Sequence, residues 1–205
     1  MTATFWDKRA SKYDEVVRAH DDDFEQVLSW TKPLLNSTDV VLDFGCASGE
    51  YSLALADCVN RVHGIDTSEQ MIALAQRKKD ERRVLNASFD QVDEFSGSLD
   101  GDGFTTVVAF DVLHLVDDAA VTLARLRELV GTGGRLISTT PCLGEWQPFV
   151  RLLIQLAQKV GLAPRIAPFT LPKLESVVTA AGFRIQEVRT AIPKTATRWI
   201  VATAR

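Results

Sequence analysis

The chain has 205 residues and a formal net charge of −4, with 46% hydrophobic and 24% charged residues. This length predicts one domain around one hydrophobic core, and the composition excludes disordered and fibrous proteins. The sequence contains no block of basic residues and no apolar run of about 18 residues. We therefore expect neither a nucleic acid nor a membrane as partner, and a cytoplasmic location.

The cysteines are Cys46, Cys58 and Cys142, which are widely spaced and have no histidine pattern nearby. An odd number without a Cys-x-x-Cys pair argues against a disulfide framework and against a zinc site. We expect reduced thiols and no bound metal.

Apolar runs of β type alternate along the chain with runs of helical periodicity. Strands are predicted at residues 40–44, 62–66, 83–86, 104–110 and 135–140. Between them, apolar residues at i, i+3, i+4 and i+7 indicate amphipathic helices around residues 51–58, 71–75 and 123–130. The alternation predicts a parallel sheet that is covered by helices on both faces.

The clearest helical stripe follows the fifth strand and consists of Phe149, Leu152, Leu153, Leu156 and Val160. Like the other helices, it is expected to cover the sheet with its apolar face. A further helix opens at Thr170 and ends at Gly182. Two strands follow, at residues 183–189 and 198–204, and their connection is short enough for antiparallel neighbours.

Residues 40–50 combine an apolar strand, a glycine turn and the start of a helix. Gly45 and Gly49 let the backbone approach a ligand closely, at the edge of the sheet where open α/β folds bind ligands. The third glycine of a GxGxxG pyrophosphate loop is missing, which disfavours a dinucleotide. Asp43 would repel a pyrophosphate but can accept hydrogen bonds from a cationic group. The turn therefore predicts a cationic ligand.

Asp66 ends the second predicted strand, about 20 residues beyond the glycine turn. An acid at this distance holds ribose hydroxyls in dinucleotide-binding α/β folds, so a ribose is expected in the ligand. The alternative is that Asp66 caps the next helix together with Thr67 and Ser68. The glycine turn upstream favours the ribose-binding role of Asp66.

Four segments together resemble the class I S-adenosylmethionine-dependent methyltransferases: residues 43–49, residues 64–68 with Met71, residues 110–115, and Gly133-Gly134. The resemblance covers nearly the whole chain. It implies a Rossmann-like, doubly wound α/β fold with a seven-stranded sheet, mostly parallel with an antiparallel C-terminal strand. It also implies S-adenosylmethionine as cofactor and S-adenosylhomocysteine (SAH) as product. The cofactor-binding residues that it implies are Tyr13, Asp43, Gly45, Cys46, Ala47, Gly49, Asp66, Thr67, Met71, Ser88, Phe89, Phe110 and Asp111.

The resemblance gives some of these residues an expected place. Ala47 stands where the family usually has a glycine, near the methionine part of the cofactor, and Ser88 and Phe89 are expected at the adenine. Tyr13 ends a segment from Trp6 that is similar to a family segment closing over the cofactor. The alternative is a helix that packs its aromatic residues on the domain surface. We expect a single domain of residues 1–205, with a helical lid at 1–35 and the Rossmann-like core at 36–205.

Methyl transfer from a sulfonium is an in-line displacement, so the enzyme mainly aligns donor and acceptor away from water. A general base helps only where the acceptor must lose a proton. His114, just after the fourth strand, is the candidate base, and the alternative is a hydrogen-bonded structural histidine. Glu145 is either a ligand of the acceptor or a partner of a helix dipole. Trp30 is available to line a partly apolar acceptor pocket.

These observations predict S-adenosylmethionine-dependent methyl transfer to a small-molecule acceptor. Residues 140–145 resemble an uncharacterised small-molecule branch of the family, and no segment resembles a module that recognises RNA, DNA or protein. One alternative is a noncatalytic regulator that binds S-adenosylmethionine, whose cofactor motifs would look the same. The other is an NAD-dependent oxidoreductase, which the missing glycine disfavours.

Overall fold

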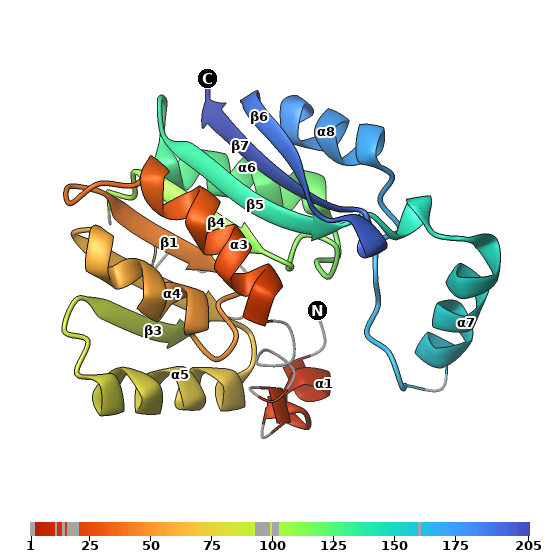
Figure 1. The fold of residues 1–205 in the computed structure, drawn as a ribbon, viewed down its shortest axis with the longest axis horizontal. Helices are drawn as coiled ribbons and strands as arrows, with labels where there is room; N and C mark the ends of the chain where they lie inside the picture. Colours follow the sequence, from red (N-terminus) through yellow and green to blue (C-terminus); the bar gives the residue numbers. More distant parts are fainter. Residues whose placement is uncertain are drawn as a thin grey trace.

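The computed structural model describes residues 3–10, 12–13, 15, 21–92, 99, 103–159 and 161–205. In this part of the chain, seven strands form one sheet in the order β3-β2-β1-β4-β5-β7-β6 (Figure 1). The strands are β1 (Val40–Phe44), β2 (Arg61–Asp66), β3 (Ala87–Gln91), β4 (Thr106–Phe110), β5 (Arg135–Pro141), β6 (Phe183–Ile192) and β7 (Thr197–Ala204). All neighbours from β3 to β5 are parallel, whereas β7 is antiparallel to β5 and β6. The expected seven-stranded mixed fold is confirmed.

Helices cover both faces of this sheet. Figure 1 shows α3 (Asp21–Thr31) and α4 (Glu50–Leu55) in front of the strands and α6 (Ala119–Val130) behind them. The other helices are α1 (Ala3–Asp7), α5 (Glu69–Arg82), α7 (Pro148–Lys159) and α8 (Leu171–Ala180), with short 3-10 helices at Lys32–Leu34, Ala56–Cys58, Leu143–Glu145 and Pro193–Thr195. Among the described residues, no helix is both long and apolar enough to cross a membrane.

The central strands are apolar on both faces because both faces are covered. In β1, the neighbouring residues Val41 and Leu42 are fully buried and point to opposite faces of the sheet. Leu42 belongs to the core beneath α6 and α8, and Val41 belongs to the core beneath α3 and α4. The acidic and glycine residues that follow these strands are thereby fixed at the carboxyl edge of the sheet.

The third strand begins four residues later than predicted. Arg83 adopts a left-handed conformation, with φ of 55°, that ends α5, so residues 83–86 do not form the expected strand. In β3, Ala87 and Phe89 are buried while Ser88 is exposed. This alternation is typical of an edge strand with one covered face. The prediction of a strand at 83–86 was therefore wrong.

The helix α7 does not cover the sheet as its apolar stripe predicted. Figure 1 shows α7 standing away from the sheet, beyond the carboxyl end of β5. The exposed fractions of Phe149, Leu152, Leu153 and Leu156 are 67%, 54%, 48% and 49%. The expectation that this stripe packs on the sheet was wrong, because periodicity identifies the apolar face of a helix but not the surface that it meets.

Candidate active site

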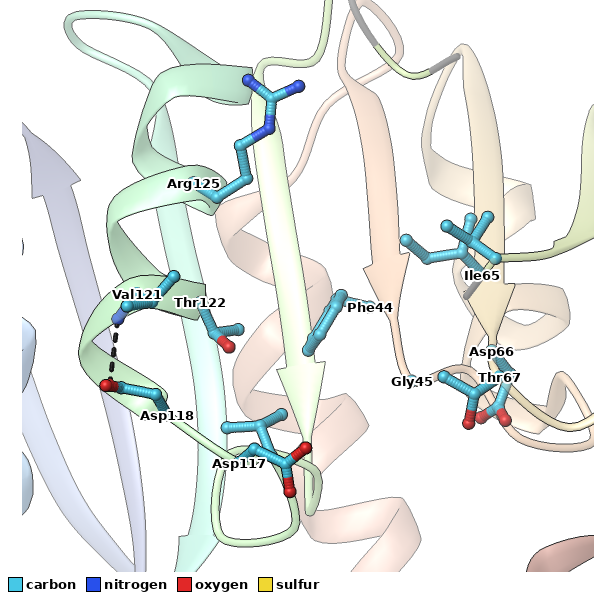
Figure 2. A pocket seen from close by; sticks show the side chains of 12 residues that line it. Phe44, Gly45, Ile65, Asp66, Thr67, Asp117, Asp118, Val121, Thr122 and Arg125 are labelled. Atoms are coloured by element: carbon cyan, nitrogen blue, oxygen red, sulfur yellow. Dashed lines mark hydrogen bonds between the residues drawn. The ribbon is translucent and has the colours of Figure 1, made fainter. Parts of the chain in front are cut away.

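Two adjoining cavities open at the carboxyl ends of the parallel strands. The larger cavity has a volume of about 460 Å³ and lies between the ends of β1 and β2 and the start of α6 (Figure 2). It is lined by Phe44, Gly45, Ile65, Asp66, Thr67, Val92, Val116, Asp117, Asp118, Val121, Thr122 and Arg125. The smaller cavity, of about 50 Å³, is lined by Trp6, Tyr13, Gly45, Ala47, Asp66, Met71, Phe110, Asp111, Val112 and Leu115. Because Gly45 and Asp66 line both cavities, one elongated ligand can occupy the two together.

The glycine turn after β1 is built from left-handed residues. The φ angles of Gly45, Ala47 and Gly49 are 75°, 47° and 78°. A Cβ atom at Gly45 would lie 2.4 Å from Cγ2 of Val112, so a side chain cannot be accommodated there. The backbone N–H groups of Gly45 and Cys46 both donate to the carbonyl oxygen of Ile65, at 2.8 and 3.0 Å. These bonds fix the turn against the end of β2.

Asp66 joins this turn to the start of α5. Its Oδ2 accepts a hydrogen bond from the backbone N–H of Ala47 at 3.0 Å, and its Oδ1 accepts one from that of Ser68 at 2.9 Å. The N-cap residue of α5 is Ser68, whose Oγ accepts from the backbone N–H of Met71. Asp66 therefore supports both the turn and the helix start while its side chain lines both cavities.

Two further carboxyl groups lie close to Asp66. Asp43 is buried beneath the turn, where Ser52 Oγ donates to its Oδ2 at 2.5 Å, and burial raises its pKa to about 7. Asp111 has a left-handed φ of 51° and accepts a hydrogen bond from Thr139 Oγ1 at 3.0 Å. The negative charges of other acidic residues act on these carboxyl groups and help to raise their pKa: Asp66 acts on Asp43, Asp7 on Asp66 and Asp23 on Asp111. This acidic cluster suits a positively charged ligand.

The N-terminal segment covers the smaller cavity. Trp6 and Tyr13 both line it, and their ring centroids are 6.3 Å apart in an edge-on arrangement. Burial, followed by the negative charges of the three aspartates, raises the pKa of the Tyr13 hydroxyl. Asp7 attaches the segment to α5, because its Oδ1 accepts hydrogen bonds from Ser68 Oγ at 2.6 Å and from the backbone N–H of Gln70 at 3.4 Å.

The sequence profile of a methyltransferase domain family matches residues 35–176, which is most of the chain and includes the glycine turn, Asp66 and Asp111. The chain belongs to this methyltransferase family. This confirms the resemblance of its sequence to the class I S-adenosylmethionine-dependent methyltransferases, with S-adenosylmethionine as the cofactor.

Individual relatives of this methyltransferase differ in how much of it they match. An uncharacterised methyltransferase of Anoxybacillus flavithermus is 26% identical over 188 residues, covering 86% of each chain. The aklanonic acid methyltransferase DauC of a Streptomyces species is 32% identical over 104 residues, covering 49% of this chain and 47% of its own. The 23S rRNA methyltransferase RlmD of Aliivibrio fischeri is 40% identical over 67 residues, covering 33% of this chain and 15% of its own.

A solved structure has the same fold over the whole chain. The complex of DhpI with SAH superposes with a TM-score of 0.76, at 21% sequence identity, and covers 98% of this chain and 94% of the DhpI chain. The N-terminal segment and the region after β5 are therefore part of a fold that a second protein shares.

Most of the predicted cofactor residues of the methyltransferase line the cavities. They are Tyr13, Gly45, Ala47, Asp66, Thr67, Met71, Phe110 and Asp111. Asp43, Cys46 and Gly49 lie behind the turn: Asp43 and Cys46 are buried, and Gly49 is in close contact with Ala75 and Phe89. These three support the turn from beneath.

Three further predicted residues, Ser88, Phe89 and His114, also lie outside both cavities. Ser88 is exposed in the middle of β3, and Phe89 is buried between this strand and the glycine turn. Val92, directly after β3, lines the larger cavity. His114 is 8% exposed, and burial lowers the pKa of its imidazole to about 4.

The residues that sequence reasoning missed follow β4 and begin α6. Val116, Asp117, Val121 and Arg125 line the larger cavity. Figure 2 shows Asp117, Val121 and Arg125 on the side opposite Gly45 and Asp66. The sequence carried one signal for them, since this segment follows a strand whose end was predicted at residue 110 and thus reaches the same edge of the sheet.

Two candidates for the acceptor side have structural contacts instead. Glu145 Oε1 accepts a hydrogen bond from the backbone N–H of Leu171 at 3.0 Å, so it stabilises the first turn of α8. Trp30 packs edge-on against the buried Trp199, with ring centroids 5.6 Å apart. Neither residue lines one of the two cavities.

Proposed function

We propose that this protein transfers the methyl group of S-adenosylmethionine to a small-molecule acceptor. The observation that carries the proposal is the pair of joined cavities, which Asp66 and Asp111 make acidic and which Trp6 and Tyr13 cover. Such a site encloses a ligand of limited size and separates it from water.

The residues present fit the cofactor. Its chemistry supplies a methyl group on a positively charged sulfur, together with an ammonium group on the methionine part. Asp111 would hold positive charge at the smaller cavity, and Asp43 would act on it through its own charge from beneath the turn. Asp66 would accept hydrogen bonds from the ribose hydroxyls. Ile65, Val92 and Val116 give the larger cavity an apolar lining that suits an adenine ring.

A small acceptor is supported by charge and by one relative. The chain carries a net charge of −4, which opposes binding to nucleic acids. DauC is named for a small molecule and matches half of this chain, whereas RlmD matches one third of it. Trp6, Tyr13 and Leu115 line the smaller cavity, so an acceptor that approaches it would meet a partly apolar, aromatic surface.

We further propose that alignment, rather than proton transfer by His114, accounts for the rate. Burial lowers the pKa of the His114 imidazole to about 4, which makes it a weak base at pH 7. His114 also lies outside both cavities, and its Nδ1 is buried without a hydrogen-bond partner among the described residues. These observations argue against its role as the base. Tyr13 and Trp6 keep water away from the reacting groups, and Asp111 at the end of β4 orients the bound molecules.

Transfer of a labelled methyl group tests the proposal. The purified protein is incubated with S-adenosylmethionine labelled in its methyl group and with three separate cell fractions: small molecules, RNA and protein. Label should appear in the small-molecule fraction, and an Asp66→Asn variant should transfer less. Label in RNA or protein instead would contradict the small-molecule acceptor. Tight SAH binding without transfer to any fraction would support a noncatalytic regulator.

A further inference from the structure

The helix α7 presents an apolar face that the described part of the chain leaves uncovered. Phe149, Leu152, Leu153 and Leu156 are each about half exposed or more, and Leu162, directly after the helix, is 69% exposed. On the opposite side of the helix, Val150 and Ile154 are only partly exposed. The outward face is therefore distinct from the face that approaches the rest of the protein, and its residues are contiguous on the helix surface.

The charge of this region differs from that of the whole chain. From Trp146 to Leu174 the sequence contains Arg151, Lys159, Arg165 and Lys173 and no acidic residue, in a chain whose net charge is −4. Lys159 and Arg165 are exposed. Lys159 and Arg165 thus place positive charge at and just after the end of the helix, and the surface that the apolar face meets should be negatively charged.

The position of α7 relates this face to the active site. The helix follows β5 at the carboxyl edge of the sheet (Figure 1). The residues that line the two cavities lie at the same edge. Arg9, in the N-terminal segment that covers the smaller cavity, donates a hydrogen bond from Nη2 to the carbonyl oxygen of Leu162 at 3.3 Å. A surface that meets α7 would therefore lie next to the cover of the active site.

We propose that α7 is an interfacial helix that docks the protein on an anionic lipid surface. The helix inserts Phe149, Leu152 and Leu156 among the acyl chains near the lipid headgroups, and Lys159 and Arg165 contact the anionic headgroups. The proposal departs from the expectation that no membrane is a partner, which rested on the absence of a membrane-spanning segment.

Vesicle sedimentation tests this docking. The full chain is mixed with vesicles of phosphatidylcholine alone or with added phosphatidylglycerol. It should sediment with the anionic vesicles only, and less so when the salt is raised from about 0.1 to about 0.5 M. The double variant Leu152→Glu/Leu156→Glu should lower the affinity by at least roughly tenfold. The double variant Lys159→Gln/Arg165→Gln, which leaves the apolar face intact, should lower it by roughly threefold to tenfold.

Leu85→Glu is the matched control, since Leu85 is 93% exposed in the connection between α5 and β3. It should sediment like the wild type. Failure of the wild type to bind anionic vesicles, or equal binding to neutral ones, would overturn the proposal. So would a concentration-dependent dimer, measured by ultracentrifugation, that Leu152→Glu/Leu156→Glu abolishes, because α7 would then be an interface between copies.

Discussion

The carboxyl group of Asp43 links cofactor binding to pH. Burial raises its pKa to about 7, so between about pH 4 and 7 the folded protein holds a proton there that an unfolded chain would release. A positively charged ligand favours the carboxylate and must expel this proton. Affinity for the cofactor should therefore fall as the pH falls below about 7, approaching a tenfold loss per pH unit.

Calorimetric titration with SAH from pH 5.5 to 7.5 measures this dependence. Asp43→Asn should bind more weakly and with little dependence on pH, while Asp57→Asn, at an exposed acid in the 3-10 helix after α4, should follow the wild type. An unchanged pH profile in Asp43→Asn would assign the proton to another group.

The side chain of Asp66 is expected to contribute directly to cofactor affinity. Asp66→Asn keeps one oxygen for the backbone N–H of Ala47 or Ser68 but loses the charge that ribose hydroxyls bond to. We expect a loss of about 1–3 kcal/mol in SAH binding, the usual range for a hydrogen bond to a charged group. Asp90→Asn is the control, since Asp90 is exposed on β3 and bonds His63. Equal affinities in folded Asp66→Asn and wild type would remove the ribose role.

His114 gives a prediction in which the expected effect is small. If its role is structural, His114→Asn should lower the melting temperature but change single-turnover methyl transfer by no more than about threefold, with the same pH profile. The measurement uses the acceptor that the labelling experiment identifies. A loss of about 10²–10⁴-fold with an altered pH profile would instead establish His114 as the general base.

At the scale of elements, the cover of the smaller cavity depends on one attachment. Asp7 accepts hydrogen bonds from Ser68 and Gln70 at the start of α5, whereas α5 keeps its own cap, Ser68, without it. Asp7→Ala should therefore release α1 and leave α5 intact. Hydrogen exchange of residues 3–10 should become faster and SAH should dissociate about threefold to tenfold faster, as expected for about 1 kcal/mol.

Asp22→Ala, at an exposed acid on α3, provides the comparison for Asp7→Ala. It should leave both rates unchanged. If Asp7→Ala behaves in the same way, and if SAH does not protect residues 3–10 in the wild type, α1 is scaffolding and the expected lid role is lost.

The elements that the sequence predicted well are those with cover on both faces. In β1 the run from Val40 to Phe44 is apolar because Val41 and Leu42 are buried on opposite sides, and its predicted bounds agree with the structure. In β3, the exposed Ser88 made an edge strand look polar, so the strand was placed too early. The exposed stripe of α7 could not be predicted from its periodicity. A helix has the same spacing of apolar residues whether it packs on the sheet or meets a separate surface.

The candidate site was predictable where a backbone conformation requires particular residues. Gly45 and Asp66 follow predicted strands at fixed spacing, and both line the two cavities. The loop after β4 and the exposed side of α6 carry no such requirement, so Asp117 in the loop and Arg125 in the helix were missed. His114 was singled out for its chemistry, but burial is a tertiary property that neighbouring residues in the sequence do not reveal.

At the scale of the whole molecule, cofactor binding should stabilise the fold, because residues after β1, β2 and β4 build the cavities together and only the folded chain brings them together. SAH at about 100 times its dissociation constant should add about 2.7 kcal/mol, which for a chain of this size raises the melting temperature by roughly 5–10 °C. Differential scanning fluorimetry measures the shift, with NAD as the control ligand. A shift with NAD and none with SAH would contradict the assigned cofactor.

The place of β7 in the sheet has a consequence for synthesis of the protein. This strand lies between β5 and β6 although it follows both in sequence. The edge of β5 therefore has no partner on that side until Thr197–Ala204 has left the ribosome. At roughly 5–20 residues per second, the intervening chain takes several seconds to make. During this interval the nascent protein exposes a strand edge that can pair with other chains, so we expect slow synthesis beyond β5 to promote aggregation.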